Sequence, residues 1–182
     1  MRPSQRTALL EASLRLLRGP DGADITLDAV AREAGITKPG LMYHFPSREA
    51  LMLAIVDHAA ASLEQAMVET LGGPLADATP AERIRAYAEV AAQGSDSRGE
   101  YAVYTEAAYR PSLAGPWLER MGRWFDLPAG LDGRTRAALT VARLAADGLW
   151  AAEATGVFPP GSADREAVVD LIRSLTSESE AR

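Results

Sequence analysis

Residues 26–51 read TLDAVAREAGITKPGLMYHFPSREAL and predict two short helices joined by a tight turn, followed by the start of a third helix. Thr26 has the hydroxyl that an N-cap needs to accept a hydrogen bond from a first-turn amide. Gly35 follows an Ala-rich segment, at the place where a left-handed residue ends a helix. Thr37 is a second N-cap, and Pro39 lies in the next first turn, where its missing N–H costs least. The pattern therefore predicts a helix, a turn and a second helix.

The second short helix is expected to end at Pro46, and Ser47 is placed to cap the helix that follows. We assign Leu41 and Phe45 to the core of this small helical domain. A helix, a short glycine-containing turn and another helix are the signature of the helix-turn-helix motif.

This segment resembles the DNA-binding segment of the TetR family of transcriptional repressors. The residues that carry the resemblance are Thr26, Ala31, Ala34, Gly35, Ile36, Thr37, Met42, Tyr43, His44, Phe45, Ser47 and Arg48. Met42 stands where the family usually has Tyr, and Arg48 stands where it usually has Lys. The match is limited to the first quarter to third of the chain, and the rest is similar only in its helical layout.

The resemblance implies a DNA-binding surface around the second short helix. Lys38 lies at the N-terminal end of that helix, the part that contacts base edges in the major groove. Tyr43 and His44 carry donors for phosphate groups, and Arg48 adds charge at a helix start, where backbone amides also favour an anion. Gly40 leaves the backbone open to close approach. The expected DNA-binding residues are Thr26, Thr37, Lys38, Pro39, Gly40, Met42, Tyr43, His44 and Arg48.

The two histidines each have a plain structural alternative. His44 either contacts phosphate or simply packs at the end of its helix, and for His58 we favour a core or surface position over a pocket wall. The chain has no cysteine and no His-Glu-x-x-His, phosphate-loop, dinucleotide-binding or Gly-x-Ser-x-Gly motif. We therefore expect no metal site, no cofactor and no enzymatic activity.

Charge is distributed unevenly along the chain. The formal net charge is −6, but residues 1–50 carry +1 and the remainder carries −7. This asymmetry fits a DNA-binding end on an acidic body. The N-terminal residues lack the pattern of a signal peptide, and we expect no apolar run to span a bilayer. A cytoplasmic protein without a membrane partner is the expectation.

Helical periodicity covers the rest of the chain, and no segment shows the alternation of a strand. The sequence therefore predicts an all-α fold of about nine helices. We expect residues 1–47 to form the DNA-binding helix-turn-helix domain and residues 48–182 to form a helical bundle for ligand binding and dimerisation.

Several helix boundaries follow from local signals. Thr79 and Ser97 each begin a capping box, with Glu three positions later. Pro111 is expected to end one helix and Pro116 to open the next, because proline is tolerated in a first turn but not in a helix interior. Ser162 is expected to cap the last helix.

Aromatic side chains gather between Tyr87 and Phe125, with Trp150 further on. A stripe of this kind is more often core than pocket, although a chamber between the helices of a bundle is also a common ligand site. The resemblance implies an effector pocket here, with core packing as the alternative. The candidate ligand-pocket residues are Tyr104, Thr105, Trp117, Met121, Trp124 and Trp150.

The helix expected at residues 134–154 is rich in alanine and glycine, which lets another helix approach closely. That neighbour is either within the chain or in a second copy. The resemblance implies that the last two helices pair with their copies in a four-helix dimer interface, and we favour this. The stripe Val168, Ile172 and Leu175 is a second part of that candidate interface.

Together these features predict a ligand-responsive transcriptional repressor. Its expected partners are a palindromic double-stranded DNA operator, a second copy in a homodimer, and a small-molecule effector. The alternative is a helical small-molecule-binding or enzymatic bundle whose N-terminal motif is only structural. DNA binding separates these two hypotheses.

Overall fold

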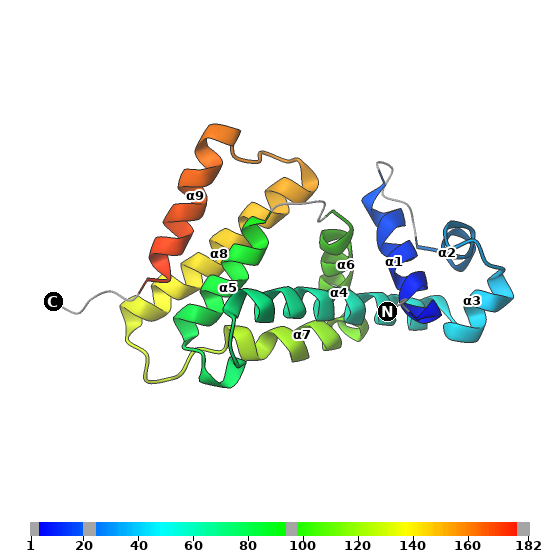
Figure 1. The fold of residues 1–182 in the computed structure, drawn as a ribbon, viewed down its shortest axis with the longest axis horizontal. Coiled ribbons are helices and arrows are strands. Elements are labelled where there is room, and N and C mark those ends of the chain that lie inside the picture. Colours follow the sequence, from blue (N-terminus) through cyan, green and yellow to red (C-terminus); the bar gives the residue numbers. More distant parts are fainter. Residues whose placement is uncertain (1–3, 20–24, 94–97, 178–182) are drawn as a thin grey trace. The chain divides into compact units, whose positions relative to one another are not determined.

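The computed structural model describes residues 4–19, 25–93 and 98–177 (Figure 1). Within these residues the chain forms nine α-helices and one short 3-10 helix. They are α1 (Gln5–Arg18), α2 (Leu27–Glu33), α3 (Lys38–His44), α4 (Arg48–Leu71), η1 (Leu75–Asp77), α5 (Pro80–Ala92), α6 (Arg98–Tyr109), α7 (Pro111–Phe125), α8 (Gly133–Thr155) and α9 (Ser162–Leu175). The predicted all-α fold of about nine helices is thus confirmed for the described residues.

The chain divides into two compact units. Unit 1 consists of Met1–Ala61 with Asp96–Leu118, and unit 2 consists of Ser62–Ser95 with Glu119–Arg182. Helices α4 and α7 each contribute residues to both units. This division by contacts differs from the functional division that the sequence predicts after residue 47, which stays a prediction.

The core of unit 1 forms where α1 packs against α2 and α6, and where α2 packs against α3. Leu41 and Phe45 are buried in it, which confirms their predicted place in the core. Helix α6 approaches α1 so closely that a Cβ atom at Gly99 would lie 2.8 Å from the carbonyl oxygen of Leu14. Any other residue at position 99 would therefore push the two helices apart.

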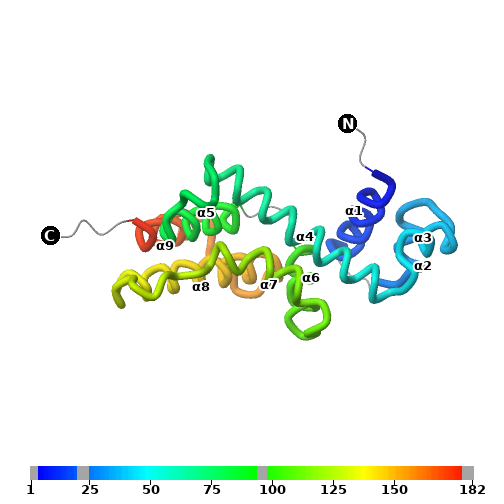
Figure 2. Tube along the Cα trace, turned by 90° about the horizontal axis from the view of Figure 1, so that it is seen from below, coloured from blue at the N-terminus to red at the C-terminus, as the bar shows by residue number. Residues whose placement is uncertain are grey.

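Unit 2 is built around α5, α8 and α9, which pack against one another (Figures 1 and 2). Its buried side chains include Ile84, Tyr87, Leu139, Ala142, Ala146, Leu149, Val169 and Ile172. Polar contacts reinforce this packing. Arg173 of α9 donates to both carboxylate oxygens of Glu89 on α5, at 2.6 and 2.7 Å. Arg85 of α5 donates to the Thr176 hydroxyl and carbonyl oxygens at 3.1 and 2.8 Å.

Two predicted helix starts are confirmed at atomic detail. The Thr79 hydroxyl accepts from the backbone N–H of Glu82 at 3.2 Å, and the Glu82 carboxylate accepts from the backbone N–H of Thr79 at 2.7 Å. This is the complete capping box. The Ser47 hydroxyl accepts from the Ala50 N–H at 3.1 Å, at the start of α4. Ser97, the first residue of the other expected capping box, lies outside the described residues.

Two other predicted starts are wrong. Helix α7 begins at Pro111, and Pro116 lies inside it. The interior proline removes one backbone hydrogen bond, but the first turn of α7 buries Leu113 in the unit 1 core, which favours the longer helix. Ser162 is the first residue of α9 rather than its cap, since Gly161 occupies the N-cap position without a side-chain hydrogen bond.

Helix α4 is long and apolar enough to cross a membrane by length and composition alone, contrary to the sequence-based expectation. Half of its most apolar stretch is buried inside the structure. Helices at the core of globular proteins pass the same test, so the length and composition of α4 give only weak support for a membrane span.

Candidate nucleic-acid interface

The segment from α2 to α3 has the local geometry that its sequence predicts. The Thr26 hydroxyl accepts from the Ala29 N–H at 3.1 Å, and the Thr37 hydroxyl accepts from the Gly40 N–H at 3.2 Å. Between these two caps, Gly35 has a φ of +68°, which is the left-handed conformation that ends α2. Two capped helices are thereby fixed on either side of one tight turn.

Helix α3 has one buried and one exposed side. Leu41 is fully buried, whereas Met42 and Tyr43 are exposed, and the side chain of Tyr43 is among the most accessible large hydrophobic groups of the described residues at 86%. A tyrosine in this position presents both a flat apolar ring and a hydroxyl to a partner. The exposed side of α3 thus has the chemistry to contact a nucleic acid.

The two basic residues that the sequence predicts for this surface are both held by hydrogen bonds. Lys38 Nζ lies 2.9 Å from Asp28 Oδ2 on α2, and both side chains are largely exposed. Such exposed ion pairs contribute little free energy, so Lys38 can exchange Asp28 for an acceptor on DNA. Arg48 Nε donates to the Ile25 carbonyl oxygen at 2.8 Å, which leaves the charge and the terminal nitrogens for a phosphate.

His44 lies at the end of α3, half-buried between two aromatic rings. Its ring centroid is 5.2 Å from that of Tyr43, edge to face, and 6.5 Å from that of Phe45. These contacts fit the packing interpretation of His44 without removing it from the surface. The other histidine, His58, is half-buried on α4, and its Nε2 lies 2.6 Å from Glu11 Oε1 on α1. His58 therefore joins two helices of unit 1.

Sequence reasoning missed two basic residues near this surface. The guanidinium of Arg6 lies over the ring of Phe45, 4.7 Å from its centroid, so α1 adds a cation beside the end of α3. Only the folded structure brings these two residues together, since they are far apart in sequence. Arg32 is exposed in the last turn of α2. The only signal for it in the sequence was its position in the predicted helix.

The candidate pocket residues fall into two groups. Tyr104, Thr105 and Trp117 belong to unit 1, and Met121, Trp124 and Trp150 belong to unit 2. In unit 1 the rings of Tyr104 and Trp117 are in contact at an interplanar angle of 52°, with centroids 5.2 Å apart. The Thr105 hydroxyl donates to the carbonyl oxygens of Tyr101 and Ala102 in its own helix.

In unit 2, Met121 and Trp124 are buried and Trp150 is half-buried. The indole N–H of Trp124 points at Glu64 Oε1 of α4, 3.4 Å away, and Arg120 and Arg123 of α7 bind the same carboxylate. Burial by itself raises the pKa of Glu64, but the hydrogen bonds from Arg120, Arg123 and Trp124 outweigh it and hold that pKa below its ordinary value. Glu64 is thus ionised and ties α4 to α7 inside unit 2.

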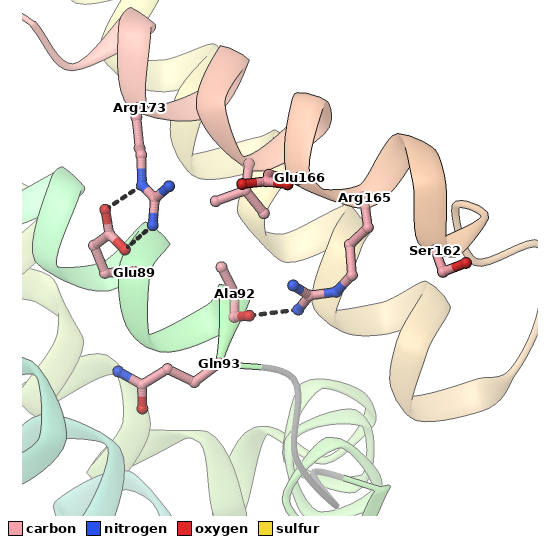
Figure 3. A pocket seen from close by; sticks show the side chains of 8 residues that line it. Glu89, Ala92, Gln93, Ser162, Arg165, Glu166 and Arg173 are labelled. Carbon is pink, nitrogen blue, oxygen red and sulfur yellow. Dashed lines mark hydrogen bonds and ion pairs between the residues drawn. The ribbon is translucent and has the colours of Figure 1, made fainter.

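A groove of about 400 Å³ runs between α5 and α9 in unit 2 (Figure 3). None of the six candidate pocket residues lines it. Figure 3 shows Arg165 donating to the Ala92 carbonyl oxygen and Arg173 binding Glu89, so its arginines are used to hold α9 on α5. Its charged lining differs from the apolar chamber expected of an effector site.

No group of three or more acidic or histidine side chains among residues 4–19, 25–93 and 98–177 is placed to hold a metal ion.

Comparison with known proteins gives family matches to both parts of the chain. The model of bacterial regulatory proteins of the tetR family matches residues 9–55, and the tetracyclin repressor-like C-terminal domain matches residues 81–177. The HTH-type transcriptional regulator EthR of Mycolicibacterium smegmatis is 39% identical over 59 residues, which cover 31% of this chain and 27% of EthR. The HTH-type transcriptional regulator BetI of Rhizobium meliloti is 34% identical over 91 residues, which cover 50% of this chain and 43% of BetI.

The chain thus spans less than half the length of either curated relative. Among solved structures, the multidrug binding protein EbrR complexed with ethidium has a TM-score of 0.63 at 24% identity, with 96% of this chain and 99% of that chain covered. That likeness is one of fold. Since the C-terminal family match alone extends over more than half of the chain and the other match contains the helix-turn-helix, the chain belongs to the tetR family of bacterial regulatory proteins.

Proposed function

We propose that the chain is a DNA-binding transcriptional repressor. It binds a near-palindromic operator as a homodimer, and a small molecule releases it. Because its target is chromosomal DNA, it acts in the bacterial cytoplasm. Unit 1 supplies the helix-turn-helix, and unit 2 supplies the dimer contact and the effector site.

The observation that carries DNA binding is the exposed side of α3. The side chain of Tyr43 is exposed, whereas that of Leu41, two residues earlier, is completely buried. One side of the helix therefore packs on the core and the other side faces solvent. Lys38 at the N-terminal end of α3 supplies a base-reading donor, and Arg48 supplies charge for a phosphate. Gly40 and the caps Thr26 and Thr37 bring the backbone close to the DNA.

The dimer contact is proposed on the exposed sides of α8 and α9. Ala142 and Ala146 pack within the protomer, so intramolecular packing accounts for that part of the small-residue stripe. Val141 and Leu144 remain exposed on α8. A two-fold axis sets the same patch of each copy against the other and presents two recognition helices to two half-sites.

On α9, Ile172 of the predicted stripe is buried inside the protomer, while its neighbour Leu171 is 65% exposed. We therefore propose Leu171, rather than Ile172, as the apolar side chain that α9 contributes to the second copy.

Release by a ligand requires that effector and operator prefer different conformations. Helix α4 is continuous from unit 1 into unit 2, and Glu64 ties it to Trp124 on α7. A ligand that repacks the aromatic side chains around Trp124 would therefore act on α4. Coupling of this kind is typically about 1–3 kcal/mol, or roughly 5- to 150-fold in operator affinity.

The test of DNA binding uses Arg48→Ala and Lys38→Ala. Arg48→Ala should weaken binding to every duplex and flatten the plot of log affinity against log salt by roughly one unit per lost phosphate contact, hence about two per dimer. Lys38→Ala should relax sequence preference more than it changes the salt slope, because base contacts carry the specificity. Fluorescence anisotropy on operator and random duplexes, at several salt concentrations, measures both.

The matched control is Arg15→Ala. It removes the same charge from unit 1, but Arg15 pairs with Glu33 and lies outside the proposed surface. Its salt slope should equal that of the wild type. If Lys38→Ala and Arg48→Ala also bind like the wild type while remaining folded, the recognition surface is misassigned. A chain that binds no DNA at all would favour the alternative of a purely structural motif.

A further inference from the structure

A second groove of unit 2 combines two arginines with small apolar side chains. It has a volume of about 390 Å³ and is formed by η1 with the residue after it, the first turn of α5 and the last turn of α7. We call it the η1 groove, and its lining residues, all in unit 2, are Leu75, Ala76, Ala78, Arg83 and Arg123. None of the six candidate pocket residues lines it, so it is a separate site.

Arg83 carries a positive charge that no carboxylate in the described part of the chain pairs with. Its two terminal nitrogens donate to the backbone carbonyl oxygens of Arg123 and Asp126, the latter at 2.9 Å. Its Nε is buried without a hydrogen-bond partner. Because a partly buried charge is unfavourable without an opposite charge nearby, Arg83 would stabilise an anion in the η1 groove.

Arg123 keeps hydrogen-bond donors for a ligand. Its side chain is 60% exposed, and one terminal nitrogen binds Glu64 Oε1. The Nε and the other terminal nitrogen of Arg123 make no hydrogen bond to a described residue. Arg120 binds the other oxygen of Glu64 at 3.1 Å, so this single carboxylate is shared between two guanidinium groups. The α7 side of the groove is therefore also positively charged.

The lining and its surroundings favour a small organic monoanion. The planar fork of a guanidinium matches the two oxygens of a carboxylate. Leu75, Ala76 and Ala78 offer an apolar surface for a short hydrocarbon part. Asp77 and Asp126 are exposed beside the groove and would repel a dianion more strongly than a singly charged group. A carboxylate joined to a short apolar chain satisfies all of these conditions.

We propose that the η1 groove binds a small organic carboxylate, whose oxygens accept hydrogen bonds from Arg123 and whose charge lies beside Arg83. Such a ligand competes with Glu64 for the Arg123 guanidinium. Since Glu64 ties α4 to α7 inside unit 2, an occupied groove loosens that tie. The consequence for operator binding rests on the proposed function, in which α4 continues into unit 1.

Hexanoate is a suitable probe, because it joins one carboxylate to a short unbranched hydrocarbon chain. Titration into the ¹⁵N-labelled protein, followed by NMR, should shift the backbone amide signals of residues 75–78 and yield a dissociation constant. Hexanamide has nearly the same shape without the charge, and acetate has the charge without the longer chain. Both, and inorganic phosphate as well, should bind more weakly than hexanoate by roughly tenfold or more.

Two variants test the groove in different ways. Arg123→Gln should weaken hexanoate binding roughly tenfold, while the other two donors to Glu64 remain and keep the protein folded. Ala78→Phe keeps both arginines and should weaken binding by a similar factor, because the larger side chain fills the groove. The matched control is Arg134→Gln, which removes an exposed arginine from another part of unit 2 and should leave hexanoate binding unchanged.

Equal affinity for hexanoate and hexanamide would overturn the inference, as would hexanoate binding that both Arg123→Gln and Ala78→Phe leave unchanged. Phosphate that binds as tightly as hexanoate would make the η1 groove a general anion site and also overturn it. Operator affinity judges the proposed function separately. A chain that binds hexanoate through Arg123 but binds no DNA contradicts that function alone, whereas a chain that binds its operator but not hexanoate contradicts only the inference.

Discussion

Replacing Trp124 with alanine should lower the free energy of unfolding by about 3–5 kcal/mol, the usual cost of removing a fully buried aromatic side chain. Trp124 has no exposed surface in the structure, and its indole N–H faces the Glu64 carboxylate. The substitution opens a cavity and also removes a donor from a buried carboxylate. Urea unfolding followed by circular dichroism measures the loss, and operator affinity at a fixed temperature should fall with it.

The same variant decides between core and pocket. If Trp124 instead lines an effector chamber, alanine should change stability little, leave DNA binding nearly intact and abolish the response to inducer. Trp117→Ala is the comparison, because Trp117 is half-buried and its ring lies at a tilt against that of Tyr104 in unit 1. It should cost less than Trp124→Ala, and equal losses would contradict the packing account.

Leu144→Glu should separate the two copies of the proposed dimer. A glutamate within the proposed apolar two-fold contact would be buried without a partner. A penalty on the order of 2–4 kcal/mol raises the dimer dissociation constant about 30- to 700-fold. Light scattering across micromolar concentrations should then give the mass of one chain where the wild type gives twice that mass.

Loss of the dimer should also weaken operator binding, because a single helix-turn-helix contacts only one half-site. Leu118→Glu adds the same charge at an exposed leucine of α7 and should leave both mass and operator affinity unchanged. A Leu144→Glu chain that keeps the mass of a dimer would place the interface elsewhere on the molecule.

The parts of the fold that local sequence signals specify were predictable. Thr26 and Thr37 each cap a helix through an amide three residues away, and Thr79 does so within a complete capping box. By contrast, the start of α7 depends on the burial of Leu113 among residues far away in sequence. The prediction that Pro116 opens this helix was therefore wrong, because tertiary packing outweighed one missing backbone hydrogen bond.

The candidate DNA site was predictable in its residues but not in its contacts. Spacing alone placed Lys38 and Tyr43 on one helix, yet it could not show that Asp28 holds Lys38 or that Arg6 covers Phe45. The pocket was harder still. Helical spacing gives the same stripe for core and chamber. The hydrogen-bond acceptor of the Trp124 indole N–H is Glu64, sixty residues earlier.

We expect the chain to recognise a specific, near-palindromic DNA sequence. Repeated selection of bound duplexes from a random library, with the purified chain, tests this expectation. The selected duplexes should be enriched in an inverted repeat whose half-sites lie about 34–36 Å apart, or a multiple of that distance, and Lys38→Ala should abolish this enrichment. A folded wild-type chain that enriches no sequence above the starting library would contradict it.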